Sequence, residues 1–408
     1  MICGLLGRKL GHSYSPQIHR ELGSYEYRIF EKEPEELEDF VRNGTYTGLN
    51  VTIPYKKDVI PFLDELSPAA KKMGSVNTII RREDGSLFGH NTDYYGFTSL
   101  VHHSGISISG KKVLVLGSGG TSNTAVKALE DLGAAVVIIS RSGQNHYGNL
   151  YLHGDASVIV NTTPVGMYPN TGIAPVNLED FPRLEGVLDV IYNPARTQLL
   201  LDAEVLGLPH ENGLWMLVAQ AKEAAECFTG KKISDQEITR IHRKLSRQME
   251  NIILIGMPGC GKTTIGSLLA KKLGRELVDL DSQIVQSAGK TIPDIFSQEG
   301  EAGFRDWESR ILAEYGKQSS LILSTGGGCV TQPRNYPLLH QNGTIFWLQR
   351  ELSLLPTDGR PLSQQNRLED LYKARKDLYE SFADYVVDNN TPPEKTAAEI
   401  IGLWEAEK

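Results

Sequence analysis

Four residues in one short stretch have the types and the spacing of a phosphate-binding loop. Gly256, Gly261, Lys262 and Thr263 fit the pattern G-x-x-x-x-G-K-[ST], and the apolar run "NIILI" at 251–255 precedes them. The glycines let backbone N–H groups surround phosphate oxygens, while the lysine and the threonine can reach the β- and γ-phosphates and Mg²⁺. With a strand expected before the loop and a helix after it, this stretch predicts an ATP site.

The chain after this loop offers charged groups that suit a phosphate acceptor. "VDLDSQI" places Asp279 and Asp281 on one side of an expected strand, where two carboxylates suit Mg²⁺ and a hydroxyl. Arg305 and Glu308 lie one helical turn apart, and a weak surface salt bridge is the alternative to a binding role. The glycines at 326–328 follow the apolar run "LILS" and let a ligand approach the backbone closely, with a flexible turn as the alternative.

An earlier glycine cluster indicates a second nucleotide site, of the dinucleotide kind. Three glycines follow the apolar run "VLVL": Gly117, Gly119 and Gly120. Ser122 stands where the dinucleotide fingerprint has its third glycine. After the next apolar run come Ser140 and Arg141, instead of the acidic residue that an NAD site places on the ribose 2′-hydroxyl. A guanidinium beside hydroxyls suits a 2′-phosphate and predicts NADP(H), with an exposed, solvated arginine as the alternative.

Polar side chains crowd several loops near the start of the chain. Ser13 and Ser15 surround an expected helix N-terminus, with Ser15 as its cap, which is a natural site for a carboxylate. "NVTIPYK" adds Thr52 and Lys56, and "GHNTDYYGF" adds Asp93. Hydride transfer to a ketone leaves an alkoxide that needs a proton, and an ammonium oriented by a carboxylate can supply it. A purely structural Lys–Asp salt bridge is the alternative.

Strand-like apolar runs alternate with helical stretches along the whole chain, which is typical of an α/β protein. At 408 residues the chain exceeds what one core usually serves, so two or three domains are expected. Between the two glycine loops, "ISDQEITRIHRKLSRQME" repeats apolar residues at helical spacing and predicts a basic amphipathic helix. We interpret it as a connector, with membrane-surface binding as the alternative. The segment 143–156 is short for a crossover, so one edge of the dinucleotide-binding sheet is expected to be thin.

The composition is that of an ordinary globular protein, with 40% hydrophobic and 23% charged residues. A net charge of −8 disfavours nucleic acid or an anionic membrane as a general partner, and no apolar run approaches the roughly 20 residues of a membrane span. The four cysteines are scattered and form no CxxC pair, which is typical of a reducing cytoplasm.

From Met1 to about Phe228 the chain resembles shikimate dehydrogenase. The motifs "HSYSP", "NVTIPYK", "VNTI", "NTDYYG", "GSGG", "NTTPVGM", "DVIYNP" and "NGLWMLVAQ" come in the order of that family. The resemblance implies that Lys56 and Asp93 are the catalytic pair and that Gly213 and Met216 lie on the cofactor side of the cleft. It implies substrate contacts from Ser13, Ser15, Thr52, Asn77, Asp93, Tyr192 and Gln220.

Residues 251–408 resemble shikimate kinase, with the phosphate loop, the D-x-D, "GEAGFRDWE", the triple glycine, "RPL" and "AR…LY" in the family's order. The resemblance implies that Asp281 contacts the acceptor hydroxyls and is a candidate base, with Lys262 also catalytic, and that Thr263 and Asp279 serve Mg²⁺. The implied shikimate-binding residues are Asp281, Arg305, Gly326, Gly327, Gly328 and Arg375. The expected ATP-binding residues are Gly256, Gly259, Gly261, Lys262, Thr263, Thr264 and the lid residue Arg360.

The predicted fold is α/β: a two-lobed reductase, with an α/β substrate lobe and a Rossmann NADP lobe, joined to a P-loop nucleoside-monophosphate-kinase-like parallel-sheet domain. We expect the substrate lobe at 1–97 and 214–233, the Rossmann lobe at 98–213, a helical linker at 234–250 and the kinase at 251–408.

The predicted function is a bifunctional, cytoplasmic enzyme of aromatic amino-acid biosynthesis. It would reduce 3-dehydroshikimate to shikimate with NADPH, and phosphorylate shikimate to shikimate 3-phosphate with ATP and Mg²⁺. We expect small-molecule substrates, no nucleic-acid or membrane partner, and leave the oligomeric state open. One alternative is a quinate-acting reductase fused to a kinase. Another is a non-enzymatic regulator that senses a metabolite, which should have lost catalytic groups that this chain retains.

Overall fold

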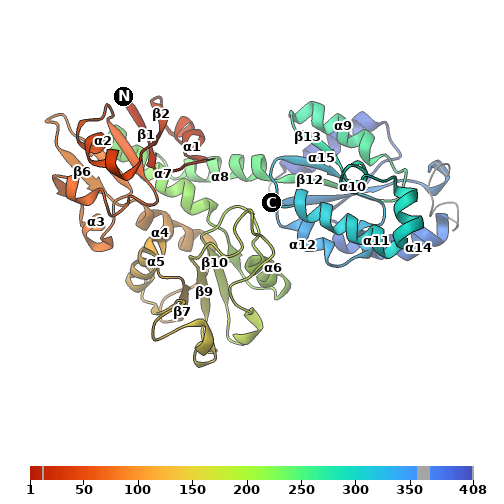
Figure 1. The fold of residues 1–408 in the computed structure, drawn as a ribbon, viewed down its shortest axis with the longest axis horizontal. Helices are drawn as coiled ribbons and strands as arrows, with labels where there is room; N and C mark the ends of the chain where they lie inside the picture. Colours follow the sequence, from red (N-terminus) through yellow and green to blue (C-terminus); the bar gives the residue numbers. More distant parts are fainter. Residues whose placement is uncertain (12, 356–367, 407–408) are drawn as a thin grey trace. The chain divides into compact units, whose positions relative to one another are not determined.

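The structure, a computed structural model, describes residues 1–11, 13–355 and 368–406 (Figure 1). The chain forms two compact units. The first comprises Met1–Val165, Ala174–Tyr192 and Asp202–Leu245, and the second comprises Gly166–Ile173, Asn193–Leu201 and Ser246–Lys408. The α/β class is confirmed, because each unit contains a five-stranded parallel sheet that packs against helices. The domain limits expected from the sequence motifs stay predictions.

The N-terminal lobe of the first unit is built on a six-stranded mixed sheet. Its strands, in the spatial order β2-β1-β3-β5-β6-β4, are β1 (Ile2–Gly7), β2 (Glu26–Glu31), β3 (Gly48–Val51), β4 (Glu65–Leu66), β5 (Thr78–Arg81) and β6 (Leu87–His90). The helices are α1 (Ser15–Leu22), η1 (Pro34–Glu36), α2 (Leu37–Asn43), η2 (Ile60–Phe62) and α3 (Pro68–Met73). Every residue of β3 is buried, and Leu49 and Val51 pack with Leu6 and Ile79. The loop that follows β3 therefore starts from a fixed point.

The second lobe of this unit is a parallel sheet in the order β11-β10-β9-β7-β8. Its strands are β7 (Lys112–Leu116), β8 (Ala135–Ile139), β9 (Val158–Asn161), β10 (Gly186–Asp189) and β11 (His210–Glu211). Its helices are α4 (Asp93–Ser104), α5 (Gly120–Asp131), η3 (Tyr147–His153), η4 (Leu178–Asp180) and α7 (Leu214–Thr229). Helix α6 (Gln198–Val205) crosses the boundary between the two units, because its first residues belong to the second unit. The predicted thin edge is confirmed: β8 is the edge strand, and residues 141–157, all of them described, contain the short 3-10 helix η3 and one isolated bridge from His146 to Ser140.

The helix predicted between the two glycine loops forms as α8 (Gln236–Met249). Its expected apolar stripe, Ile238, Ile241, Leu245 and Met249, is buried. On its basic side, Arg240 and Lys244 both pair with Glu21 of α1, at 2.8 Å and 2.6 Å. The apolar face of α8 is therefore covered by protein, and part of its positive charge is neutralised within the first unit.

The second unit has a parallel sheet in the order β13-β14-β12-β15-β16, with α9 and α15 drawn above it and α11 and α12 below (Figure 1). The strands are β12 (Asn251–Ile255), β13 (Glu276–Asp279), β14 (Leu321–Ser324), β15 (Gly343–Gln349) and β16 (Tyr385–Asp388). The helices are α9 (Lys262–Leu273), α10 (Leu280–Ala288), α11 (Ile292–Tyr315), η5 (Cys329–Thr331), α12 (Asn335–His340), η6 (Leu352–Leu354), α14 (Leu368–Phe382) and α15 (Pro393–Glu405). Central strand β12 is buried throughout, as its apolar sequence requires. Among the helices in the described part of the chain, none has the length and apolar character that crossing a membrane requires.

Candidate active sites

The first unit contains a cleft of about 510 Å³ between its two lobes. Most of the residues predicted for the reductase line it: Ser13, Ser15, Thr52, Lys56, Asn77, Asp93, Gly120, Tyr192, Gly213, Met216 and Gln220. Gly117, Gly119, Ser140 and Arg141 are not part of this lining. They belong to the turns after β7 and β8, where a dinucleotide would extend away from the substrate.

Lys56 and Asp93 form an ion pair at the cleft, with 2.6 Å between Nζ and Oδ2. Lys56 lies in the loop after β3, and Asp93 is the first residue of α4. The N-terminus of a helix attracts negatively charged side chains. The side chains keep 24% and 13% of their exposure, so the ammonium faces the cleft instead of being sealed in a core. The pair can hold a proton beside a substrate oxygen.

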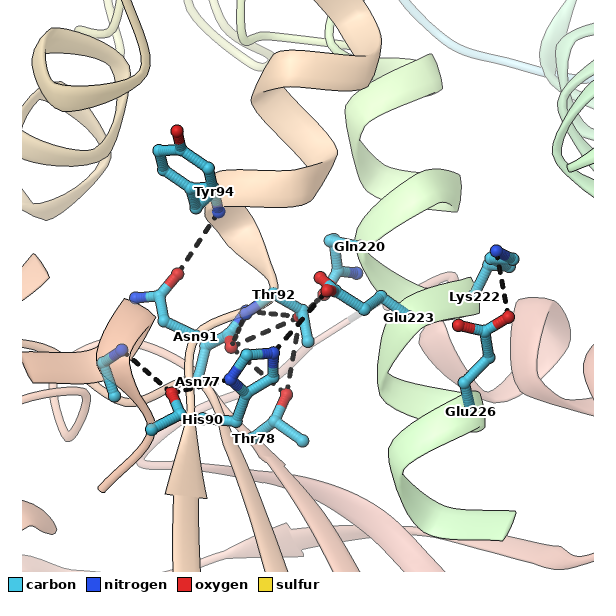
Figure 2. Close-up of polar contacts among 12 residues, drawn as sticks. Asn77, Thr78, His90, Asn91, Thr92, Tyr94, Gln220, Lys222, Glu223 and Glu226 are labelled. Carbon is cyan, nitrogen blue, oxygen red and sulfur yellow. Dashed lines mark hydrogen bonds and ion pairs between the residues drawn. The ribbon is translucent and has the colours of Figure 1, made fainter. Parts of the chain in front are cut away.

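A buried polar network surrounds Thr92, the residue that precedes Asp93 in the chain (Figure 2). The side chain of Asn77 accepts from the backbone N–H of Thr92 at 2.8 Å and donates to its hydroxyl at 3.0 Å. Thr92 in turn donates to Gln220 Oε1 of α7, at 3.4 Å. Helices α4 and α7 also cross closely, since a Cβ on Gly96 would meet the carbonyl oxygen of Met216 at 2.8 Å. Thr92 was not among the predicted site residues, although it lies inside the "NTDYYG" motif.

The start of α1 differs in detail from the prediction. Ser15 is the first residue of the helix and Tyr14 occupies the cap position, so the expectation that Ser15 is the cap is wrong. Instead, the hydroxyl of Ser13 accepts from the backbone N–H of Ser15 at 3.2 Å. Both hydroxyls still line the cleft at a helix N-terminus, which is the environment that a carboxylate favours. Burial raises the pKa of Tyr192, which lines the same cleft and therefore stays a neutral hydrogen-bond donor.

The glycine loop after β7 has the close contacts and the open face of a dinucleotide-binding turn. Gly117 has φ of 111°, and a Cβ there would meet Thr162 Oγ1 at 2.9 Å. Nothing lies within 4 Å of a Cβ built on Gly119 or Gly120, so this side of the loop is open. Ser122, in place of the third glycine, is buried and donates to the carbonyl of Gly117 at 2.7 Å. The serine therefore stabilises the turn from inside.

After β8, the Ser140 hydroxyl donates to the backbone carbonyl of Ser142 and stiffens the turn that carries Arg141. Arg141 itself is exposed at the edge of the sheet. Its position at the carboxyl end of the second strand of the sheet is where dinucleotide folds read the ribose 2′ substituent.

The second unit contains a cleft of about 650 Å³ at its phosphate loop. The predicted residues that line it are Gly259, Gly261, Lys262, Thr263, Thr264, Asp279, Asp281, Arg305, Gly326, Gly327, Gly328 and Arg375. Gly256, the first residue of the loop, is not part of this lining. Arg360 lies outside the described residues. The groups predicted for a phosphate donor and for its acceptor therefore share one cavity.

The phosphate loop is held by its own lysine. The Lys262 ammonium donates to the carbonyl oxygens of Gly256 and Met257, at 2.9 Å and 3.1 Å, and the residue is 7% exposed. Gly256, Gly259 and Gly261 all have positive φ, the left-handed region that glycine enters without strain. The loop therefore presents its backbone N–H groups and one cation to the cleft.

The hydroxyl of Thr263 donates to Asp279 Oδ2 at 2.7 Å, which brings together the two groups predicted for Mg²⁺. The described ranges hold no cluster of three or more His, Cys, Asp or Glu side chains suited to a metal. A hydroxyl next to one carboxylate fits Mg²⁺, because this ion usually takes its other ligands from water and substrate phosphates.

Asp281 is not on a strand, so that expectation is wrong. Strand β13 ends at Asp279, whose carboxylate accepts from the backbone N–H of Ser282 at 3.2 Å and caps α10. Asp281 lies in the first turn of that helix. Although Asp279 ends a strand and Asp281 lies in a helix, both residues line the cleft.

Arg305 and Glu308 form a buried ion pair, and the surface salt bridge considered above is wrong. The two atoms Nη1 and Oε2 lie 2.9 Å apart, and the side chains are 5% and 1% exposed. Burial raises the pKa of Glu308, against the opposing effect of Arg305, and the nearby Asp281 carboxylate raises it further. Glu308, which was not among the predicted site residues, fixes the guanidinium at the cleft. The sequence feature that could have identified Glu308 was its position one helical turn after Arg305.

The triple glycine is required by close approach, and not by flexibility. A Cβ on Gly326 would meet Glu308 Oε1 at 2.6 Å, and one on Gly328 would meet Arg305 Nη2 at 2.2 Å. The carbonyl of Gly327 accepts from Arg375 Nη1 at 2.9 Å. The three glycines thus let two arginines converge on the cleft.

The fold and the two clefts define a two-part α/β enzyme, with a Rossmann-type reductase site and a separate P-loop phosphotransferase site. Residues 5–79 match the family model described as "Shikimate dehydrogenase substrate binding domain", and residues 258–404 match the model described as "Shikimate kinase". The NADP(+)-type shikimate dehydrogenase of Clostridium perfringens is 36% identical over 264 residues, which cover 59% of this chain and 97% of the relative. The chain belongs to the shikimate dehydrogenase family, and it also carries a shikimate kinase domain.

Solved structures agree with this assignment. Shikimate dehydrogenase 1 from Peptoclostridium difficile is 36% identical, with a TM-score of 0.56, over 60% of this chain and 97% of that protein. The Thermus thermophilus enzyme, in complex with NADP(H) and shikimate, is 29% identical with a TM-score of 0.55, over 60% and 99%. The predicted family and fold of the reductase part are therefore confirmed.

Proposed function

We propose that this chain catalyses two successive reactions of the shikimate pathway. The first unit reduces 3-dehydroshikimate to shikimate with NADPH, and the second transfers a phosphoryl group from ATP to shikimate, giving shikimate 3-phosphate. The observation that carries the proposal is that each family match coincides with one cleft in which the chemically required groups converge. The named relatives support NADP as the cofactor of the reductase.

In the reduction, the substrate carbonyl carbon accepts a hydride, which bound NADPH supplies. Lys56 gives the proton from Nζ to the carbonyl oxygen, and Asp93, 2.6 Å away, orients the ammonium and stabilises its charge. Ser13 and Ser15 hold the substrate carboxylate at the N-terminus of α1, and Asn77 and Gln220 bind its hydroxyls. Arg141, exposed at the end of β8, binds the 2′-phosphate and selects NADPH over NADH.

In the phosphoryl transfer, Arg305 and Arg375 hold the shikimate carboxylate, and Asp281 accepts the hydroxyl proton. Lys262 and the loop N–H groups neutralise charge on the phosphates. Thr263 and Asp279 would hold Mg²⁺, which would offset negative charge on the phosphates. The sequence resemblance implies a lid role for Arg360, which lies outside the described residues.

We place the enzyme in the cytoplasm because its four cysteines are unpaired, and three of them, Cys3, Cys260 and Cys329, are buried.

The proposal is tested with one preparation and two variants. Lys56→Ala should abolish reduction and leave phosphorylation intact, whereas Lys262→Ala should do the reverse. Both activities are measured on each variant, with circular dichroism as the folding control. Loss of both activities from either change, in a folded protein, would contradict two separate sites.

A second test places 3-dehydroshikimate, NADPH, ATP and Mg²⁺ in one reaction and follows products over time. Shikimate should appear first and shikimate 3-phosphate second. Running the reductase assay with quinate tests the alternative that the first unit is a quinate-acting reductase. Absence of turnover with 3-dehydroshikimate, shikimate and quinate would favour a non-enzymatic regulator.

A further inference from the structure

Two buried polar residues, Asn161 and Asp189, occupy the carboxyl ends of the neighbouring strands β9 and β10. They are paired in register, and both are fully buried. The residues before them in each strand, Val160 and Leu188, are apolar core residues. A buried carboxylate is costly unless several donors surround it, so an apolar pair would stabilise the sheet more simply. In open α/β sheets this end of the strands is where ligands bind.

Donors from two segments converge on this pair. Asn161 Nδ2 donates to both oxygens of Asp189, each at 3.1 Å, and the backbone N–H of Ile191 donates to Asp189 Oδ1 at 3.0 Å. On the other side, Asn161 Oδ1 accepts from the backbone N–H and the hydroxyl of Thr163, at 3.0 Å and 2.7 Å. Through these contacts, each of the two side chains fixes the loop that follows its own strand.

The two loops held by this pair serve opposite sides of the reductase site. The loop after β9 contacts the dinucleotide turn, since a Cβ on Gly117 would meet Thr163 Cγ2 at 3.1 Å. The loop after β10 contributes Val190 and Tyr192 to the cleft wall. Its Ile191 carbonyl accepts from the N–H of Gly213 at 2.9 Å, just before α7 with Met216 and Gln220 begins. The chain of contacts thus runs from the cofactor turn to the substrate wall.

We propose that Asn161 and Asp189 are a positioning pair for hydride transfer. Their contact sets the spacing between the dinucleotide-binding turn and the substrate wall, and hence the alignment of the hydride donor with the carbonyl carbon. The inference rests on the proposed reductase function. It adds two positioning residues that are not part of the cleft lining, and no charge or proton of theirs enters the reaction.

The test compares Asp189→Asn, Asn161→Asp and the double variant that exchanges the two residues. In Asp189→Asn, an NH₂ group replaces one of the two acceptor oxygens and faces the NH₂ group of Asn161, so the loops lose their fixed spacing. We expect kcat for 3-dehydroshikimate reduction to fall about 10- to 100-fold, because small misplacements of reacting groups cause losses of this size. KM for both substrates should stay within about threefold. The double variant restores one amide and one carboxylate, and it should recover most of kcat.

A second readout separates positioning from loss of structure. With NADPH carrying deuterium in the transferred position, the isotope effect on kcat should rise in Asp189→Asn and return towards the wild-type value in the exchanged variant. Kinase activity of the same chain reports that the protein is otherwise intact. Asn177→Asp is the control, because it makes the same amide-to-carboxylate change as Asn161→Asp but at η4. There Asn177 caps the turn by accepting from Glu179 N–H at 3.2 Å, and the variant should leave reduction unchanged.

If Asp189→Asn does not fold, Thr163→Val replaces it, because this variant removes one donor to Asn161 at a less buried position. It should lower kcat by a smaller factor, with the isotope effect shifted in the same direction. An unchanged kcat and isotope effect in these variants, or failure of the exchanged pair to recover activity, overturns the inference. Absence of reduction by the wild-type chain would instead overturn the proposed function.

Discussion

Gly328 gives the sharpest test of how the kinase cleft is built. A Cβ at this position would lie 2.2 Å from Arg305 Nη2 and 2.4 Å from its Cζ. An ordinary contact needs about 3.5 Å, so Gly328→Ala must push the guanidinium back by about 1.3 Å. Because the obstacle is the end of a long side chain and not backbone, the protein can yield there without unfolding.

This displacement should weaken the binding of shikimate and leave the binding of ATP unchanged. A charge-assisted hydrogen bond to the substrate carboxylate is worth about 1.5–3 kcal/mol, so KM for shikimate should rise about 10- to 100-fold. The move also weakens the pair between Arg305 and Glu308, which costs about 1–3 kcal/mol when a buried group loses its partner. A domain with a stability of about 5–15 kcal/mol remains folded after such a loss.

Steady-state kinetics with each substrate varied in turn decide the outcome. KM for ATP and the reductase activity of the same chain should stay at their wild-type values. Gly402→Ala in α15 is the matched control, because nothing lies within 4 Å of its Cβ, and it should leave all parameters unchanged. An unaltered KM for shikimate in Gly328→Ala, or an equal rise for ATP, would refute the assignment of Arg305 to the substrate carboxylate.

Three further predictions concern the cofactor, acid stability and the thiols. Arg141→Ala should lower the preference for NADPH over NADH by about 5- to 30-fold, the worth of one exposed contact of about 1–2 kcal/mol, and an unchanged ratio of kcat/KM values would contradict it. Burial lowers the pKa of His19 from 6.5 to about 3, so the folded protein holds this imidazole neutral. The contribution of His19 to the free energy of unfolding is therefore complete above pH 6.5 and is lost as the pH falls towards 3. The loss of stability at pH 5.5 is about 1.4 kcal/mol relative to high pH. Denaturant titrations should show this loss in the wild-type protein and not in His19→Phe. Burial also raises the pKa of Cys3 and Cys329 to about 12, so both should resist iodoacetamide at pH 8 in the native protein, as peptide mass mapping would report.

The parts of the site that could be predicted are those written in contiguous motifs. The phosphate loop needs glycines, a lysine and a threonine within a few residues, because one turn of backbone must surround one phosphate. Its Lys262 and Thr263 accordingly lie where the pattern places them. Lys56 and Asp93 are 37 positions apart and meet at 2.6 Å. Only the family resemblance could pair them, because no local spacing links a loop to the start of a distant helix.

Other contacts were missed because they form across strand ends and helix turns. Thr92 bonds to Asn77, 15 positions away, and Asn161 bonds to Asp189, 28 positions away. The available signal was a polar residue at the end of an otherwise apolar strand, as in "VIVN" and "GVLD". The placement of Asp281 was wrong for a related reason: Asp279 caps a helix, which ends the strand earlier than the alternation of side chains suggests. A capping side chain and a strand residue of the same type cannot be told apart by period alone.

The two clefts are proposed to hold the same small carboxylate by different means, and electrostatics gives the reason. The kinase must bring a carboxylate close to the several negative charges of a triphosphate. Neutral donors cannot offset that repulsion in a partly buried site, whereas Arg305 and Arg375 can. Burying a guanidinium requires a counter-ion before substrate arrives, and Glu308 provides it at 2.9 Å. The reductase cleft already has the ammonium of Lys56, and a second cation beside it would repel that ammonium. Hydroxyls at a helix N-terminus bind the carboxylate there without adding such a charge.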